Sequence, residues 1–416
     1  MDTFFVDVIG EIRAFYRADI IYPIFLEKNI VMILLEYIIW SPDPVIFKIP
    51  LSFLGLPDRP IVWYGLLFAM GFIIGQQISY KIFKTEGHSE KDVDTLTTFM
   101  VIATILGARL GHCLFYNPSY YLSDPIEILK IWEGGLASHG GAIGIFVALW
   151  LYANYDIRLK WILVIPTSFS VKKRKKEGQS YLWVLDRVAI VVAITGALIR
   201  TGNFMNSEME GVKTKSDFGV VYARGTEGIL NFDENVIEDV VFEEGVYDPG
   251  NPGYLPLKAV LKLKSGVQED EAMKRFINGQ LAYSLNNYQE VVQHVDFTSS
   301  KRGLDYQIID EAGVEQIEIK ATGILRHTPQ LYEALACLII AFILWVLWNY
   351  KRATLNDGLI FSVFMVLLWG DRFFNEFFKM DQEAFEASLP INMGQILSIP
   401  LILIGLAVFL KTVQKR

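Results

Sequence analysis

Seven apolar runs constrain the fold of this chain more than any other feature of its sequence. They are separated by polar stretches and lie at about residues 61–82, 93–115, 138–155, 182–199, 331–348, 359–369 and 391–410. A helix that crosses the hydrocarbon core of a membrane needs about 20 apolar residues, and aromatic residues extend the short sixth run. Hydrophobic residues make up 52% of the chain, too many for an ordinary soluble enzyme of this length. The runs therefore predict an all-α polytopic membrane protein with about seven transmembrane helices.

Basic residues follow the apolar runs in a regular way. They stand at Lys81 and Lys84 after the first run, at 172–176 after the third, at Lys351 and Arg352 after the fifth, and at the C-terminus. Because loops rich in lysine and arginine stay in the cytoplasm, all these positions fall on the cytoplasmic side when consecutive spans alternate in direction. They therefore predict a consistent topology with a cytoplasmic C-terminus. The formal net charge of −8 argues against a nucleic-acid partner, since phosphate backbones attract basic proteins.

The composition divides the chain into four parts. Residues 1–60 hold short apolar runs among charges and prolines, which we interpret as interfacial segments. Residues 61–211 carry the first four predicted spans, and residues 327–416 carry the last three. Residues 212–326 are polar, with alternating stretches that are typical of strands and a helix predicted over 269–287. The predicted strands are 257–263, 291–297, 306–309 and 316–319. We therefore expect an inserted extracytoplasmic α+β domain that is rich in strands.

The polar residues that end the fourth apolar run are the first candidates for a functional site. Arg200 is followed closely by Asn203, Asn206 and Glu208, and Gly211 closes the stretch. A lone arginine at the end of a span is most often a snorkelling anchor that reaches lipid headgroups. Anchoring does not need the amides and the carboxylate that follow here, whereas a planar guanidinium beside amides suits a phosphate. We therefore predict a site for a lipid phosphate at the membrane surface.

Three further residues fall on the same predicted face of the membrane as Arg200. His139 opens the third span, Arg372 follows the sixth, and Tyr64 opens the first. Two arginines can neutralise a phosphodiester and the phosphate that leaves it, and a histidine that titrates near neutral pH can accept the proton of a thiol. Structural interpretations stay open: His139 as a neighbour of a helix N-cap, and Arg372 with Glu376 as an ion pair one helical turn apart.

The remaining polar and sulfur groups narrow the chemistry. Arg109 lies on an apolar face, where a charge needs a partner, so structural pairing is its first interpretation. Cys113 and Cys337 lie within apolar runs and predict neither a disulfide framework nor a nucleophile. The sequence has no His/Asp/Glu cluster at metal-ligand spacing, no G-x-S-x-G elbow and no P-loop. We therefore expect neither a metal nor another cofactor, and neither serine hydrolysis nor nucleotide chemistry.

Six blocks of the sequence carry a resemblance to a known family. They are G-A-R-L-G-H-C-L-F-Y-N at 107–117, G-G-L-A-S-H-G-G-A-I-G at 134–144, R-T-G-N-F-M-N-S-E at 200–208, H-T-P-Q-L-Y-E at 327–333, R-F-F-N-E-F-F at 372–378 and M-G-Q-I-L-S-I-P at 393–400. In this order and spacing they resemble the bacterial prolipoprotein diacylglyceryl transferase family. The resemblance implies transfer of the diacylglyceryl group of phosphatidylglycerol to the lipobox cysteine thiol of a prolipoprotein, with a thioether formed and glycerol phosphate released.

The resemblance also implies a location, partners and residue roles. It implies the bacterial cytoplasmic (inner) membrane, with the active site at the periplasmic face. The implied partners are phosphatidylglycerol, a prolipoprotein signal peptide with its lipobox cysteine, and the surrounding membrane lipids. The implied catalytic residues are His139, Arg200, Arg372 and Tyr64. The implied phosphatidylglycerol-binding residues are Arg200, Arg372, Asn203, Asn206, Glu208, Gly211, Glu376 and Arg109.

Two features depart from the family. Residues 207–211 read S-E-M-E-G where the family usually reads G-E-L-W-G, which removes an aromatic residue next to Gly211. The segment 212–326 is also longer than its usual counterpart in the family.

Two other classes of function stay open. A transporter for an anionic solute would line its path with the arginines, but the charged groups gather at one predicted face and no pair of broken spans occurs at matching positions. A non-catalytic membrane scaffold would give the segment 212–326 a partner to bind, but it would leave the blocks around His139 and Arg200 without a role.

Overall fold

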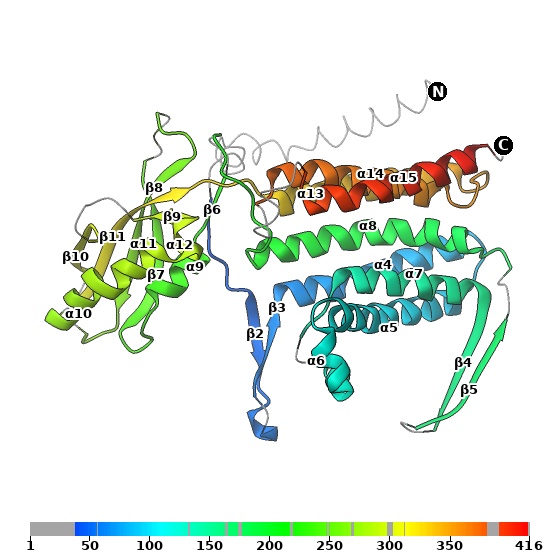
Figure 1. Cartoon of the computed structure of the whole chain (residues 1–416), viewed down its shortest axis with the longest axis horizontal. Helices are drawn as coiled ribbons and strands as arrows, with labels where there is room; N and C mark the ends of the chain where they lie inside the picture. Colours follow the sequence, from blue (N-terminus) through cyan, green and yellow to red (C-terminus); the bar gives the residue numbers. More distant parts are fainter. Residues whose placement is uncertain are drawn as a thin grey trace, which may run out of the picture. The chain divides into compact units, whose positions relative to one another are not determined.

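The structure is a computed structural model of the chain. It describes residues 38–414 apart from 56, 132–133, 163–164, 174–176, 217–218, 247, 249, 268–269, 298–302, 312 and 381–390, and only the backbone of 54, 158–162 and 165–169. The interfacial segments predicted before residue 38 therefore lie outside the described residues. The chain falls into two compact units (Figure 1). We name them the helical unit, Asp43–Met209 with Pro329–Arg416, and the sheet unit, Met1–Pro42 with Glu210–Thr328.

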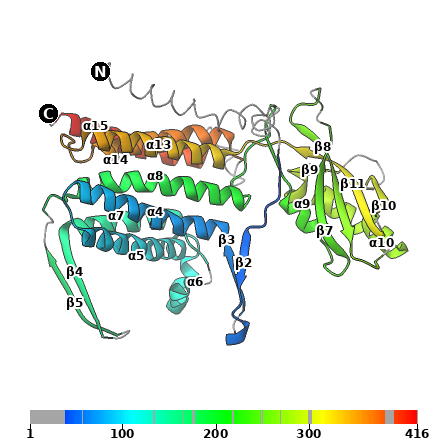
Figure 2. The same cartoon turned by 180° about the vertical axis from the view of Figure 1, so that it is seen from behind.

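Seven long helices make up most of the described helical unit (Figure 2). They are α4 (Trp63–Thr85), α5 (Glu90–Phe115), α7 (Ser138–Asn154), α8 (Tyr181–Met205), α13 (Pro329–Lys351), α14 (Leu359–Asn375) and α15 (Met393–Val413). Five of them, α4, α5, α8, α13 and α15, are long and apolar enough to cross a membrane. The prediction of a mostly helical, multi-pass membrane protein is thus confirmed with five candidate spans. Helices α7 and α14 have 17 residues each and do not add to that number.

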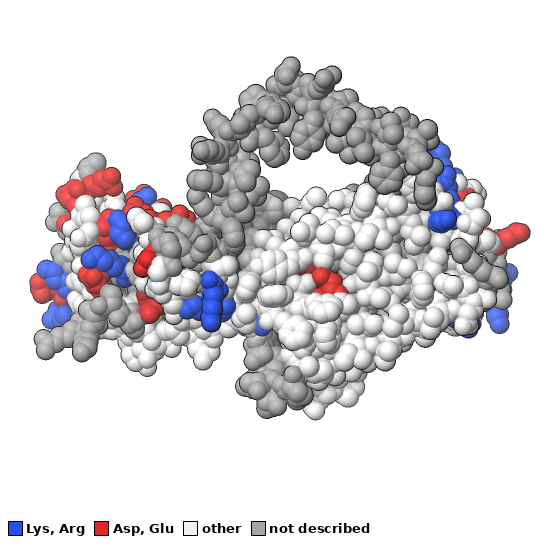
Figure 3. Space-filling view, turned by 90° about the horizontal axis from the view of Figure 1, so that it is seen from above, with Lys and Arg blue, Asp and Glu red and all other residues white. Residues whose placement is uncertain are grey.

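The surface of the helical unit agrees with a membrane environment. Figure 3 shows a broad face of this unit on which charged residues are scarce. Over the helical unit as a whole, large apolar side chains are exposed, for example Ile102, Phe342 and Leu403, which are 52%, 68% and 59% accessible. Exposure of this much apolar surface to water is unfavourable, whereas contact with lipid chains has no such cost.

Helices α5 and α7 approach each other closely because both present glycine. Gly107 and Gly111 of α5 face Gly140 and Gly144 of α7, each pair with the four-residue spacing of small residues that membrane helices use for packing. A methyl group on Gly140 would overlap the carbonyl oxygen of Gly107 and lie 2.6 Å from the Cα of Gly111. The backbones are therefore in direct contact, and the contact begins one residue after His139.

The helices run in alternating directions, which brings particular helix ends together. Strands β2 (Val45–Ile49) and β3 (Arg59–Val62) lead into α4, and the short helix α6 (Pro118–Ser123) follows α5. Figures 1 and 2 place these elements at one end of the helical unit, with the starts of α4, α7, α13 and α15 and the ends of α5, α8 and α14. At the other end, the connection after α7 forms an antiparallel hairpin, β4 (Tyr155–Ile162) and β5 (Ile165–Lys173), where the sequence indicated only a loop.

A partly buried carboxylate connects three helices at the hairpin end. The Glu86 carboxylate, at the end of α4, accepts hydrogen bonds from Arg187 Nε at 3.1 Å and Nη2 at 2.8 Å. The indole N–H groups of Trp183 and Trp348 donate to the same carboxylate at 2.9 and 2.5 Å. Both oxygens of this partly buried acid thus accept charge-assisted or indole hydrogen bonds from α8 and α13, which offsets the cost of removing the ion pair from water.

The sheet unit is built on a curled antiparallel sheet. Its strands lie in the order β10 (Tyr306–Glu311), β11 (Val314–Ile324), β8 (Tyr254–Leu263) and β7 (Ile237–Glu244), and β9 (Val295–Asp296) also pairs with β11. Strands β1 (Ile38–Trp40) and β6 (Val220–Tyr222) form a separate parallel pair. The apolar side chains of one face are buried under helices, and the other face carries cross-strand ion pairs such as Lys258 with Glu243 and Glu318 at 2.8 and 3.1 Å. An inserted strand-rich domain was therefore predicted correctly.

Most local predictions in the sheet unit are confirmed, and one is wrong. The strands predicted at 257–263, 306–309 and 316–319 lie within β8, β10 and β11. The helix predicted over 269–287 is found as α10 (Glu271–Phe276), a π turn (Ile277–Leu281) and α11 (Ala282–Asn287). The strand predicted at 291–297 is instead the end of α12 (Gln289–Val292), a turn and the two residues of β9. A short apolar alternation is ambiguous, because a helix end followed by a strand buries Val291 and Val295 equally well.

Candidate active site

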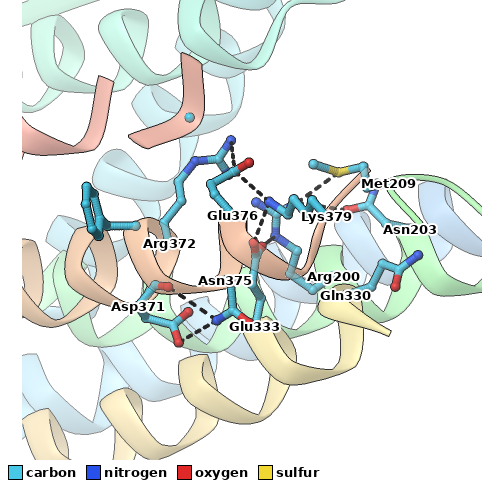
Figure 4. A network of polar contacts seen from close by, with 12 residues as sticks. Arg200, Asn203, Met209, Gln330, Glu333, Asp371, Arg372, Asn375, Glu376 and Lys379 are labelled. Atoms are coloured by element: carbon cyan, nitrogen blue, oxygen red, sulfur yellow. Dashed lines mark hydrogen bonds and ion pairs between the residues drawn. The ribbon is translucent and has the colours of Figure 1, made fainter. Parts of the chain in front are cut away.

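Arg200 lies in the last turns of α8, and its guanidinium contacts three neighbours (Figure 4). Its Nε forms an ion pair with the Glu333 carboxylate of α13. Its Nη1 donates to the sulfur of Met209 at 3.1 Å and to the amide oxygen of Asn203 at 3.5 Å. A thioether is a weak acceptor and the amide contact is long, so Nη1 has no strong partner among the residues that the structure describes.

The turn after α8 holds Glu208 in a fixed position. The Glu208 carboxylate accepts from the amides of Asn203 and Asn206 at 3.0 and 3.1 Å. The residues on either side, Ser207 and Met209, have φ values of 51° and 60°, a left-handed conformation that non-glycine residues rarely adopt. Such strain is typical of functional segments, where the surrounding contacts hold the backbone in place.

Arg372 belongs to the same network, through a second acid and a lysine. Its Nη2 lies 3.4 Å from the Glu376 carboxylate, one helical turn away, as the structural interpretation of the sequence expected. Lys379 places its Nζ 2.8 Å from Glu376 and 2.6 Å from Glu333. Asn392, the N-cap of α15, donates to the other oxygen of Glu376 at 3.2 Å. The structure therefore joins Arg200, Glu333, Lys379, Glu376 and Arg372 in one chain of ion pairs, visible in Figure 4.

Tyr64 stands beside this network, in the first turn of α4. Gly202 of α8 packs against it, since a Cβ added to Gly202 would lie 3.0 Å from the Tyr64 Cα. The phenol interacts electrostatically with Glu208 and Arg200. Four residues predicted from one sequence block and one from a distant span thus lie together, because glycine lets α4 and α8 come close.

His139 occupies the first turn of α7, at the same end of the helical unit. Its ring lies edge-on to Phe115, with ring centroids 5.1 Å apart, and tilted to Tyr116 at 6.0 Å. Hydrogen bonds and ion pairs among the described residues do not link His139 to the network of the arginines. Of the predicted catalytic residues, it is the one that stands apart from this network among the described contacts.

The guanidinium of Arg109 makes hydrogen bonds to the backbone of the protein. Its side chain is buried, and it donates to the carbonyl oxygens of Glu127 at 2.5 Å, Ile128 at 3.0 Å and Gly134 at 2.6 Å. These acceptors belong to the connection between α5 and α7, so the guanidinium shapes that connection, in agreement with the structural pairing expected first.

Gly211 lies in the sheet unit. A Cβ there would overlap the carbonyl oxygen of His327 and lie 2.7 Å from its Cβ, so close backbone approach requires glycine at this position.

Sequence reasoning missed the two residues that connect the arginines. Glu333 ends the block at 327–333, and Lys379 follows the block at 372–378 by one residue. A signal existed for Lys379, since it lies three residues after Glu376, a spacing that favours an ion pair on a helical turn. Among the described residues, the ion-pair partners of Glu333 are remote from it in sequence, so no local pattern indicated its role.

Comparisons with known proteins identify the family. The sequence model of the family described as prolipoprotein diacylglyceryl transferase matches residues 51–165 and 160–411. The chain is similar to the phosphatidylglycerol–prolipoprotein diacylglyceryl transferase of Porphyromonas gingivalis, with 32% identity over 92% of this chain and 97% of the relative. It is similar to that of Tolumonas auensis, with 30% identity over 91% of this chain and 98% of the relative. With most of its length matched, the chain belongs to the prolipoprotein diacylglyceryl transferase family.

Proposed function

We propose that this protein transfers the diacylglyceryl group of phosphatidylglycerol to the lipobox cysteine of prolipoproteins, at the periplasmic face of the bacterial cytoplasmic membrane. The thiol sulfur attacks the glycerol carbon that carries the phosphate. A C–S bond forms, the C–O bond to the phosphate breaks, and glycerol phosphate leaves with the electron pair. The products are a thioether-linked prolipoprotein and a phosphate monoester.

The observation that carries this proposal is the position of Arg200 and Arg372 at the two ends of one ion network. Their side chains are 19% and 29% exposed, whereas the acids between them are only 5% and 9% exposed. Two accessible guanidiniums with N–H groups to spare can bind the phosphate of a lipid. They also stabilise the charge that develops on the phosphate as the C–O bond breaks.

The remaining roles follow from the chemistry of each group. His139 accepts the proton of the cysteine thiol, directly or through a water molecule. Tyr64, Asn203 and Glu208 orient the headgroup and Arg200. Asn206 donates to Glu208 and so holds its carboxylate in place, and Glu376 holds Arg372 through their ion pair. Arg109 and Gly211 act from a distance, through the connection between α5 and α7 and through the close approach to His327.

The proposed topology has seven spans, with the site on the periplasmic side. Helices α7 and α14, at 17 residues, are each about 25 Å long, close to the hydrocarbon thickness of about 30 Å. The basic residues Lys81, Lys84 and Lys351 lie at the ends of α4 and α13 that are remote from the arginines, as a cytoplasmic location requires. Residues 212–326 then form a periplasmic domain inserted between α8 and α13.

The direct test supplies the purified protein with phosphatidylglycerol and a lipobox peptide. We expect a mass increment of one diacylglyceryl group on the peptide cysteine. His139→Ala and Arg372→Ala should lower the rate by on the order of 10²–10³-fold, the usual effect of removing one catalytic base or one charge-stabilising donor. Arg352→Ala, an exposed arginine beyond the opposite end of α13, serves as the control and should keep the rate. Normal rates in the first two variants would refute the assigned roles.

A second test concerns the inserted domain. Residues 215–322 are replaced by a short linker, and thioether formation is measured on the same peptide. Retained transfer means that the domain is an accessory to the reaction. Complete loss of transfer in a protein whose helical unit remains folded means that the domain shapes the entrance for the prolipoprotein.

A further inference from the structure

Lys379 occupies the centre of the ion network. Its ammonium group contacts Glu333 Oε1 at 2.6 Å and Glu376 Oε1 at 2.8 Å, and its side chain is 3% exposed. Each of these acids contacts one arginine in addition, Arg200 or Arg372. Lys379 is therefore the ion-pair link between the two halves of the network in the described chain, and it is too deeply buried to meet a lipid headgroup itself.

The way in which Arg200 meets Glu333 leaves part of its guanidinium unused. The contact is made through Nε, while Nη1 faces the weak acceptor Met209. A guanidinium and a lone carboxylate normally form a bidentate pair that uses two N–H groups. Here the second oxygen of Glu333 is taken by Lys379, so it cannot draw Nη groups away from the site.

The same reasoning applies to Arg372. The Glu376 oxygen that it approaches at 3.4 Å is shared with Lys379 at the shorter distance of 2.8 Å, and the other oxygen accepts from Asn392. Glu376 is thus largely satisfied by buried partners. Arg372 keeps a looser contact and a more exposed side chain, which suits a group that must bind and release an anion.

We propose that Glu333 and Lys379 are positioning residues, which hold the two arginines by one edge and spare their remaining N–H groups for the phosphate of the lipid donor. This inference rests on the proposed function and deepens it. Neither residue touches the substrate. Both act by saturating the buried acids and by setting the charge of the network, which has three cations and two carboxylates among its ion-paired members.

Two substitutions that change the charge of the network in opposite directions should shift the KM for the lipid in opposite directions. Glu333→Gln adds one positive charge to the network, and Lys379→Met removes one. Phosphatidylglycerol is anionic, so the KM for this lipid should fall in the first variant and rise in the second. A unit charge about 8 Å away, at an effective dielectric constant of about 40, corresponds to a change of about fivefold in each direction. In both variants kcat should fall by about 10²-fold, because a misplacement of about 1 Å at a reacting group has an effect of that order.

Two further variants separate charge from geometry. The double variant with Glu333→Gln and Lys379→Met restores the net charge, so its KM should return to within about twofold of the unmodified protein, while kcat stays low. Glu333→Asp keeps the charge but shortens the side chain by one methylene group, so KM should stay unchanged while kcat falls. Lys379→Arg keeps the bridging cation and should recover most of kcat. Lys351→Met, an exposed lysine at the opposite end of α13, is the control.

The measurement is the rate of thioether formation against the phosphatidylglycerol concentration in micelles of fixed composition, with thermal unfolding of each variant recorded. Shifts of KM in the same direction for Glu333→Gln and Lys379→Met would overturn the inference, as would unchanged kcat values. A merely structural role, with lowered thermal stability but unchanged KM in the folded fraction, also overturns it. If Lys379→Met does not fold, Glu333→Gln and Glu333→Asp still decide. Absence of transfer by the unmodified protein would instead refute the proposed function.

Discussion

The contact between α5 and α7 supports a prediction that compares two adjacent glycines. A Cβ on Gly140 would overlap the Gly107 carbonyl oxygen, and it would lie 2.6 Å from the Gly111 Cα and 3.0 Å from the Gly111 nitrogen. All three obstacles are backbone atoms, which cannot rotate away. A Cβ on Gly141 would meet its nearest atoms at 3.6 to 3.9 Å, an ordinary packing distance. The two substitutions differ by one position in the sequence and should have opposite effects.

The magnitude follows from the space available. Gly140→Ala must separate the two helices by about 1 Å, and overpacking of this kind costs about 2–3 kcal/mol of unfolding free energy. Gly141→Ala should stabilise the helix by about 0.5–1 kcal/mol, because alanine loses less backbone entropy than glycine. The displacement in the first variant also carries His139, the preceding residue, so the rate of transfer should fall by about 10²-fold.

Both quantities can be measured on the same preparations. The free energy of unfolding is obtained by titration with a denaturing detergent in mixed micelles, and the rate of transfer by the appearance of diacylglyceryl peptide. We expect Gly140→Ala to be about 3 kcal/mol less stable than Gly141→Ala, the sum of the two effects. Equal stability of the two variants within about 0.5 kcal/mol, with equal rates, would mean that the helices do not pack backbone to backbone and would refute the reasoning.

Three further predictions follow from other contacts. Glu86→Gln should lower the unfolding free energy by about 3 kcal/mol without changing KM, because it leaves the buried Arg187 with the longer, 3.4 Å contact to Asp186 as its remaining ion pair in the described chain, at the end of the unit remote from Arg200 and Arg372; a changed KM would contradict this. Arg109→Lys should increase hydrogen exchange in the connection between α5 and α7, since one ammonium cannot replace the forked donor, and unchanged exchange there would speak against its structural role. Burial lowers the pKa of His327 below its ordinary value, so the unfolded state binds more protons than the folded state as pH falls through about 6.5. The free energy of unfolding should therefore decrease on acidification, and its slope against pH should be shallower in His327→Gln. Equal slopes for the two proteins would contradict the assignment.

The position of the long helices was predictable because its causes are local. Runs of apolar residues of membrane length can satisfy their backbone groups in lipid only as helices, and the structure has a helix at each of the seven runs. The strand-rich character of residues 212–326 was predictable for a similar reason, since alternation of apolar and polar residues determines which face of a strand is buried. The prediction of a strand at 291–297 was wrong, because this stretch is too short for its periodicity to distinguish a helix end from a strand.

The candidate site was predictable only in part. Arg200, Asn203 and Glu208 lie within one block of sequence, and their mutual contacts span only a few residues. The contact of Arg372 with Glu376 follows from helical spacing. The ion pairs of Glu333 with Arg200 and Lys379 were not predictable, because they join helices that are distant in the chain.

The sequence by itself therefore determined which segments enter the membrane and which residue types stand at their ends, because hydrophobic length and helical spacing act between neighbours along the chain. Only the tertiary structure decided which acid holds which arginine, and that Arg109 is bound to carbonyl groups of its own connection. Ion pairs and hydrogen bonds act over a few ångströms, and the separations between helices are set at that precision by the glycines where their backbones touch.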